Sequence, residues 1–309
     1  MAQCHILELT SLTRSRSFRL TVFAIATIWL VGNCTALAQQ LTSGSGGRAF
    51  RDEAISSIPV QELNADAQVK INDVINNCSF YRRLPVTSIE VDPEYFVLLT
   101  RYPEIVVETW RLMGVTQMET ERTGPFELHS NDGAGTISDI ELLYGTEDYH
   151  LFYGSGSYDG PLNRKPLDGK CLIVMRTEYA VNDQGIKTAT NQLDVFLKVD
   201  HVAASFVART LSPIVGRTAD HNFVESLKFV QRLNETTEKN GPGVQGMAYR
   251  LSGLTPEVRQ LFIDTAGGVF ERKQLASQPA SATSMSASAP TPIAPANESS
   301  SLPTSSYVR

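Results

Sequence analysis

The spacing of apolar residues predicts helices in the first part of the folded region. Between residues 64 and 77 apolar positions recur every three or four residues, which is typical of an amphipathic helix. Two further helices are predicted from their start signals, Asp92-Pro93-Glu94 and Tyr102-Pro103-Glu104, since an N-cap side chain and a proline in the first turn favour helix initiation. The segment between the first helix and Asp92, "RRLPVTSIEVD", alternates in its second half and predicts a strand.

Residues 115–200 show the alternation of an antiparallel sheet. Strands are predicted at 115–122, 125–130, 135–144, 149–156, 170–181 and 187–200, separated by turns rich in Gly, Asn, Asp and Pro. The last strand places Leu193, Val195, Leu197 and Val199 on one face and polar residues on most of the other. One face of the predicted sheet is therefore expected to be buried.

A long amphipathic helix is predicted after the last strand. Phe223, Leu227, Val230 and Leu233 form one apolar stripe opposite charged residues. Pro213 and Gly216 precede this stripe and could divide the helix. Such a one-sided helix needs a wide apolar surface, and the preceding sheet is the candidate.

This order of elements resembles the helix-grip fold of the START-like superfamily, which includes polyketide cyclases and lipid-transfer domains. The resemblance covers about residues 80–238 and is carried by "DPEYFVLLTRYPEIVVETWRLMG" and by "LDVFLKVDHVAASFVARTLSPIVGRTADHNFVESLKFVQRLN". It implies an α+β fold in which a curved antiparallel sheet of about seven strands wraps a long C-terminal helix. It also implies a cavity between sheet and helix, which some members use to carry an apolar ligand and others use for catalysis.

The first 38 residues are predicted to be a cleaved export signal. The apolar run Leu20–Val31 follows an Arg-rich start, and small Ala36 and Ala38 place the cleavage before Gln39. The run is much shorter than the about 20 residues that a membrane-spanning helix needs. We therefore expect a periplasmic or extracellular protein with no integral span in the mature chain, and a retained membrane anchor is the lesser alternative.

The remaining flanks are predicted from composition. Residues 39–55 are polar and glycine-rich and predict a flexible lead-in to a domain over 56–240. A helix start at Thr255-Pro256-Glu257 predicts a short helical extension over 241–274. Residues 275–309 are rich in Ser, Ala and Pro and predict a disordered tail.

Charge and metal-ligand spacing exclude some classes of partner. The net charge of the 309-residue chain is −6, and there is no Lys/Arg stripe, so nucleic acid is not an expected partner. The histidines are not paired at metal-ligand spacing, and neither a metal nor another cofactor is expected. Cys78 and Cys171 remain after cleavage, and either one disulfide or two buried thiols fits them.

A few residues could contact a ligand in the implied cavity. Arg176 and Glu178 share one strand face, and they form either a buried charge pair or a solvated pair on the outside. Tyr153 and Tyr179 offer rings with hydroxyl groups, and Trp110 could cover a pocket mouth, although all three also suit ordinary packing. These residues give three hypotheses: an exported binding protein for an apolar or amphipathic small molecule, a cyclase- or hydratase-like enzyme, or an envelope protein without a ligand.

Overall fold

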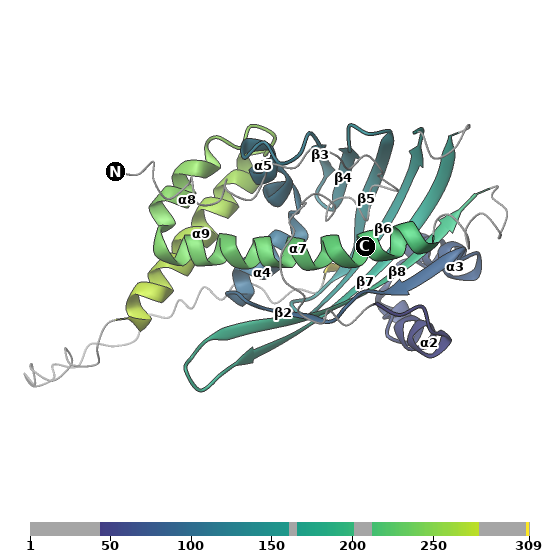
Figure 1. Ribbon diagram of the computed structural model, residues 1–309, viewed down its shortest axis with the longest axis horizontal. Helices are drawn as coiled ribbons and strands as arrows, with labels where there is room; N and C mark the ends of the chain where they lie inside the picture. Colours follow the sequence, from purple (N-terminus) through teal and green to yellow (C-terminus); the bar gives the residue numbers. More distant parts are fainter. Residues whose placement is uncertain (1–43, 161–165, 201–211, 278–306, 309) are drawn as a thin grey trace, which may run out of the picture.

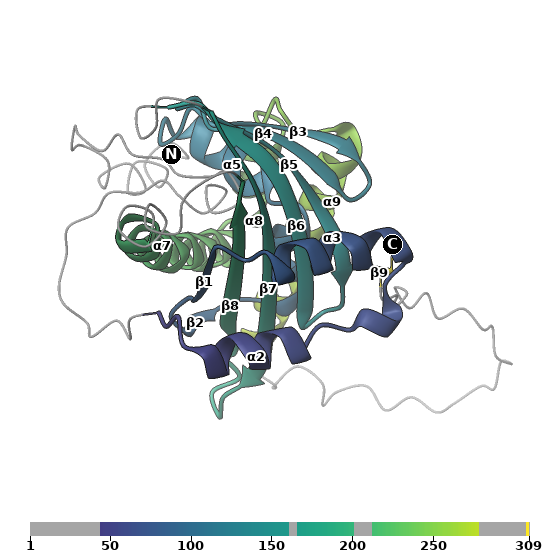
Figure 2. The same ribbon diagram turned by 90° about the vertical axis from the view of Figure 1, so that its right-hand side faces the viewer.

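The computed structural model describes residues 44–160, 166–200, 212–277 and 307–308, and its elements are arranged as one sheet with helices on both faces (Figures 1 and 2). The helices are α2 (Arg48–Ser56), the 3-10 turn η2 (Val60–Glu62), α3 (Ala65–Asn76), α4 (Pro93–Arg101), α5 (Glu104–Leu112), α7 (Ser212–Lys239), α8 (Gly241–Ala248) and α9 (Pro256–Ala276). The strands are β1 (Phe80–Arg83), β2 (Thr87–Glu90), β3 (Glu119–Gly124), β4 (Glu127–Asn131), β5 (Thr136–Gly145), β6 (Tyr149–Tyr158), β7 (Leu167–Val181), β8 (Lys187–Val199) and β9 (Tyr307–Val308).

The described strands form one nine-stranded antiparallel sheet, in which seven strands follow the order β1-β8-β7-β6-β5-β4-β3, β2 pairs with β8 and β9 pairs with β5. β1 and β2 pair with successive stretches of β8, and the predicted first strand is therefore split. The split lies at Leu84-Pro85-Val86, where proline has no N–H to continue the ladder. The other strands overlap the ranges that the alternation predicts, although β3 starts at Glu119 and not at residue 115.

Helix α7 lies across one face of the curved sheet (Figure 1). We call this the inner face, and the opposite one the outer face. The α+β helix-grip fold predicted from the sequence is confirmed by this arrangement and by the strand order. The helix is continuous from Ser212 to Lys239, so Pro213 and Gly216 do not divide it, and a proline in the first turn interrupts no helical hydrogen bond. The expected passage from strand into helix falls on residues 201–211, outside the described residues.

Separate hydrophobic cores lie on the two faces of the sheet. The inner core joins the sheet to α4, α5, α7, α8 and α9. The outer core lies under α2 and α3, which cross the outer face of the sheet at β7 and β8 (Figure 2). Asn64 caps α3 by accepting a hydrogen bond from the Ala67 N–H at 2.8 Å.

Two segments of the flanks form regular elements in the structure. The lead-in predicted over 39–55 includes helix α2, whose Ala54 is fully buried against the outer core. Burial of one side of α2 holds it on the sheet, although its sequence is polar and short. The tail predicted to be disordered contains Tyr307–Val308, which pair as β9 with Tyr144 and Gly145. That end of β5 extends beyond its pairing with β4, and a sheet edge of this kind can accept another strand.

A buried charge cluster ties α2 to the outer face. Asp194, fully buried on β8, accepts hydrogen bonds from the Tyr81 hydroxyl at 2.6 Å, from Arg83 Nε at 2.8 Å and from Arg176 Nη2 at 2.9 Å. Glu53 of α2 accepts from the same two arginines, at 2.9 Å each. Although burial opposes it, bonding to Asp194 and Glu53 raises the pKa of Arg83. The two carboxylates and the two guanidinium groups of the cluster therefore neutralise one another.

Replacing Asp194 by Ala should destabilise the protein by about 3–5 kcal/mol, because Arg83 would stay buried without its main counter-charge. Glu53→Gln is the matched control, since Glu53 is half exposed and its ion pairs should contribute at most about 1 kcal/mol. Denaturant unfolding of both variants measures the difference. Equal losses in the two variants would show that Asp194 does not anchor the cluster.

Candidate functional site

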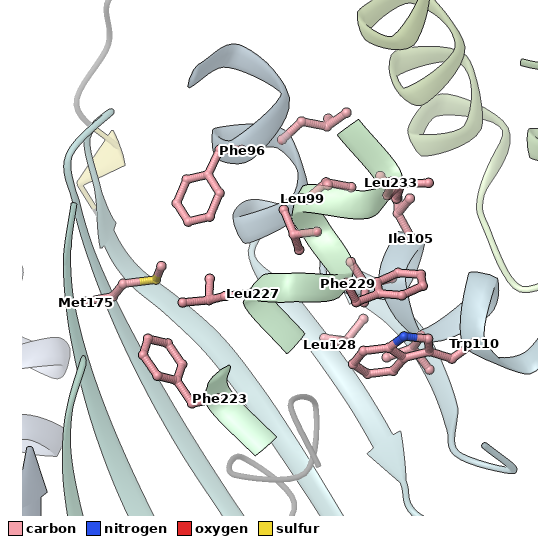
Figure 3. Close-up of a cluster of buried hydrophobic side chains, with 14 of the residues drawn as sticks. Phe96, Leu99, Ile105, Trp110, Leu128, Met175, Phe223, Leu227, Phe229 and Leu233 are labelled. Atoms are coloured by element: carbon pink, nitrogen blue, oxygen red, sulfur yellow. The ribbon is translucent and has the colours of Figure 1, made fainter. Parts of the chain in front are cut away.

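The candidate site is the space occupied by the inner core, between the inner face of the sheet and helix α7. At one end this space is filled with large apolar side chains, among which the rings of Trp110 and Phe229 lie 5.4 Å apart (Figure 3). Phe96 and Leu99 reach it from α4, and Met175 reaches it from β7 (Figure 3). We call this region the apolar end.

Helices α8 and α9 close the outside of the apolar end. The ring of Phe262 on α9 stacks on Tyr95 of α4 at 6.1 Å, and the hydroxyl of Thr237 on α7 bonds the Tyr95 hydroxyl at 3.0 Å. Arg272 of α9 donates to Asp92, the N-cap of α4. These contacts hold α4, α7 and α9 together, so the helical extension is part of the wall around the inner core.

The other end of the inner face carries hydroxyl groups instead of apolar side chains. Thr120 on β3 is paired with Ser130 on β4, and Ser130 is paired with Ser138 on β5. Thr136 lies two positions before Ser138 and shares its face. We call these four residues the hydroxyl row. Their exposed fractions lie between 0% for Ser130 and 7% for Thr120, so all are at least nine-tenths buried.

Helix α7 turns polar groups to the same end. Asn222 and Ser226 precede Phe229 and Leu233 at positions i, i+4, i+7 and i+11, so these residues share one face of the helix. Phe229 and Leu233 belong to the inner core, and Asn222 and Ser226 are buried as well. Both β4, from Leu128 to Ser130, and α7, from Phe229 back to Asn222, lead away from α4. Asn222 therefore lies at the end of α7 that is farther from α4, on the same helix face as Phe229 and Leu233.

Five polar atoms of this end have no hydrogen-bond partner among the described residues. This holds for the hydroxyls of the whole hydroxyl row and for Nδ2 of Asn222. A buried polar group without a partner costs about 1–3 kcal/mol, and folded proteins contain few of them. Their gathering at one end of the inner face is therefore a candidate binding site for a group that can form hydrogen bonds.

Two charged groups, Arg122 and Asp132, lie close to the hydroxyl row along the chain. Arg122 lies two positions from Thr120 on β3 and donates to both carboxylate oxygens of buried Glu104, at 2.5 and 2.8 Å. Asp132, in the turn after β4, accepts from the N–H groups of Ala134 and Thr136 through Oδ1. Its Oδ2 is buried without a partner among the described residues.

A buried histidine lies on the inner face nearer to α4. His150 on β6 is fully buried, its Nε2 accepts from Arg101 Nε at 3.3 Å, and its ring stacks on Phe152 at 6.2 Å. Burial, helped by the charge of Arg101, lowers the pKa of His150 to about 3. The imidazole is therefore neutral near pH 7.

The structure separates the residues proposed from the sequence as ligand contacts. Trp110 and Tyr179 lie on the inner side, where Tyr179 meets Phe96 edge to face at 6.4 Å. Tyr153 and Arg176 lie on the outer face, Tyr153 in the outer core and Arg176 in the charge cluster with Asp194. Glu178 shares that face and is exposed. The five residues therefore do not line one space, because successive positions on β7 point to opposite faces.

The two cysteines are not bonded to each other. Both are thiols, with Cys171 buried in the inner core and Cys78 packed against the outer core. The disulfide considered from the sequence is not formed in the structure. Burial raises the pKa of the Cys171 thiol.

The hydroxyl row was not found from the sequence. Its residues stand in strands that carry polar residues at both alternating positions, as in Ser138 beside Asp139 on β5. That pattern does not show which face is inner until the register is known. Two polar faces on neighbouring strands of a buried sheet are nevertheless a usable signal, since an ordinary core strand has one apolar face.

Over the described ranges of the chain, no group of three or more His, Cys, Asp and Glu is placed to hold a metal ion. None of the helices described is both long enough and apolar enough to cross a bilayer.

Comparison with known proteins gives structural neighbours alone. No protein-family model and no curated protein matches the sequence. Similar solved structures include a conserved protein from Geobacillus kaustophilus, with 10% identity, a TM-score of 0.34, and 48% of this chain and 93% of that chain covered. An uncharacterised protein from Rhizobium leguminosarum has 15% identity, a TM-score of 0.29 and coverages of 48% and 95%. Ara h 8.0201 has 12% identity, a TM-score of 0.25 and coverages of 47% and 97%. The fold assignment therefore rests on the strand order of the protein itself.

Removing an unpartnered hydroxyl should not destabilise the protein. We expect Thr136→Val and Ser130→Ala to leave the free energy of unfolding unchanged or to raise it by up to about 1 kcal/mol, because each removes a buried group without a partner. Thr177→Val is the matched control on the inner face. Its hydroxyl donates to Asn191 Oδ1 at 3.0 Å, and its loss should cost about 1–3 kcal/mol. Losses as large at Thr136 and Ser130 as at Thr177 would contradict this description of the hydroxyl row.

The neutral state of His150 should make the protein less stable in mild acid. Its folded pKa of about 3 lies below the ordinary value of 6.5, so the unfolded chain takes up the proton first as the pH falls. Stability should therefore fall between pH 6.5 and 3, by up to about 1.4 kcal/mol per pH unit. In His150→Gln the slope of unfolding free energy against pH, measured from pH 7 to 4.5, should be shallower. Identical slopes in the two proteins would refute a depressed pKa.

Proposed function

We propose that this protein is an exported binding protein that holds an apolar or amphipathic small molecule between the sheet and helix α7. The observation that carries the proposal is the division of the inner face into an apolar end and an end with buried, unpartnered hydroxyls. Ligand sites are mostly apolar with a few polar groups that fix orientation. The apolar end would pack against the apolar part of an amphipathic ligand, and the end with the hydroxyls would form hydrogen bonds with its polar group.

Binding is favoured over catalysis by the state of the titratable groups on the inner side. Glu104 and Glu108 are buried and form ion pairs with Arg122 and Arg111, at 2.5 Å each. His150 is bonded to a cation and is neutral, with a pKa far below the range where an acid or base works near pH 7. A cyclase- or hydratase-like enzyme would need an acid or base that is free to exchange a proton with the ligand, and these three groups do not supply one.

A purely structural role is disfavoured by the hydroxyl row. A core that serves only to hold the fold together is expected to satisfy its buried polar groups or to replace them by apolar ones. Here several buried hydroxyls from neighbouring strands, together with Asn222 from α7, remain without partners among the described residues. A ligand would supply those partners.

Export is proposed from the sequence alone. The apolar run Leu20–Val31, followed by Ala36 and Ala38, has the form of a cleavable signal. After export, the protein would carry its poorly soluble ligand in the periplasm or outside the cell.

Native mass spectrometry of the protein, produced with its full sequence and recovered from the exported fraction of a bacterial host, tests the proposal. We expect a bound species that is lost on denaturation and is recovered by organic extraction, because the apolar end should retain its ligand. The intact mass of the denatured chain should also show that residues 1–38 have been removed. A bare chain that does not bind the neutral apolar dye Nile red would contradict ligand binding.

A further inference from the structure

Building on the proposed function, we propose that the ligand carries an uncharged hydroxyl group, which is bound by the hydroxyl row and Asn222. The ligand class is therefore an apolar alcohol, as opposed to a carboxylic acid or an amine. The inference follows from the kind of groups at the polar end, their unused bonding capacity and the placement of the described charges around them.

The groups at the polar end match an alcohol in donors and acceptors. Each hydroxyl of the row can both donate and accept, and Nδ2 of Asn222 can donate. An alcohol oxygen offers two lone pairs and one O–H, so it can accept from Asn222 or a row hydroxyl and donate to another. All these protein groups are neutral, and none is engaged with another described residue.

The cationic side chains that could bind a carboxylate ligand are either bonded to other groups or exposed to solvent. Carboxylates in proteins are usually met by Arg or Lys. Arg122, on the same strand face as Thr120, is held by both carboxylate oxygens of Glu104 and also donates to the carbonyl oxygens of Arg101 and Pro125. On α7, Arg217 and Lys228 are exposed on the side opposite the sheet.

The positive end of the helix dipole of α7 is too far from Asn222 to bind an anion in place of those cations. A helix N-terminus attracts anions, but the effect falls off within the first turn. Ser212 begins α7, and Asn222 lies about 15 Å further along the helix axis. The unpartnered Oδ2 of Asp132 would repel an anionic group that approached from the turn after β4. An acid buried here would therefore lose its hydration without gaining a counter-charge.

Matched ligand pairs test the inference directly. The probes are decan-1-ol, decanoate and decylammonium, with naphthalen-2-ylmethanol and naphthalene-2-carboxylate as a ring-shaped pair, each measured at pH 8 by competition with Nile red. We expect each alcohol to bind at least about tenfold more tightly than its charged counterpart, because the charged group must be desolvated without an opposite charge.

Hydroxyl-deleting variants locate the polar contact. Ser138→Ala and Thr120→Val should each weaken alcohol binding by about three- to tenfold, which corresponds to one lost hydrogen bond. Thr177→Val, whose hydroxyl is already bonded to Asn191, should leave alcohol binding unchanged. Because the row hydroxyls have no partner, the two row variants should fold at least as well as the natural protein.

The possible results separate the inference from the proposed function. Charged probes that bind as tightly as the alcohols, or alcohol binding that is unaffected by both row variants, would overturn the uncharged hydroxyl ligand while ligand binding itself stood. Preference for decylammonium would overturn it in favour of a site at Asp132. If none of the probes displaced Nile red and no bound species were recovered, the proposed function would fall together with the inference.

Discussion

The structure depends on the burial of one face of helix α7 against the curved sheet. Phe223, Leu227 and Val230 are nearly inaccessible there, and a helix with such a stripe is stable only when another element covers it. The sheet can cover α7 because its strands are long and twisted, and because α2 and α3 protect its other face. The fold is therefore a sheet buried on both sides, with each side serving a different purpose.

Charged groups on the outer face pair around Asp194 and Asp73, whereas one end of the inner face carries a row of buried hydroxyls without a partner among the described residues. On the outside, Asp194 satisfies Tyr81, Arg83 and Arg176 within hydrogen-bond distance, and Asp73 does the same for Lys170 and Lys198. On the inside, the hydroxyl row has unused donors and acceptors. This contrast within one sheet distinguishes a region that only holds the fold together from one that is suited to a ligand.

Much of the fold could be predicted from the sequence because its signals are local. The alternation in β8, the start signals of α4 and the stripe of α7 each depend on residues close together in the chain. The site was harder, because its residues meet only through strand register: Ser130 lies between Thr120 and Ser138, and neither neighbour is close to the other in sequence. Arg176 and Glu178 were conspicuous because they are charged, yet β7 turns them to the outer face. Helix α2 was missed because packing, and not its own sequence, holds it in place.

The central claim is that an apolar alcohol lies along the inner face with its oxygen at the hydroxyl row. Intermolecular nuclear Overhauser effects between decan-1-ol and selectively labelled methyl groups measure this orientation directly. The account predicts contacts from the ligand's carbinol protons to the methyl groups of Thr120 and Thr136, and contacts from its terminal methyl to Leu227 or Met175. Contacts confined to the surface of the protein, or a reversed orientation with the carbinol beside Met175, would contradict it.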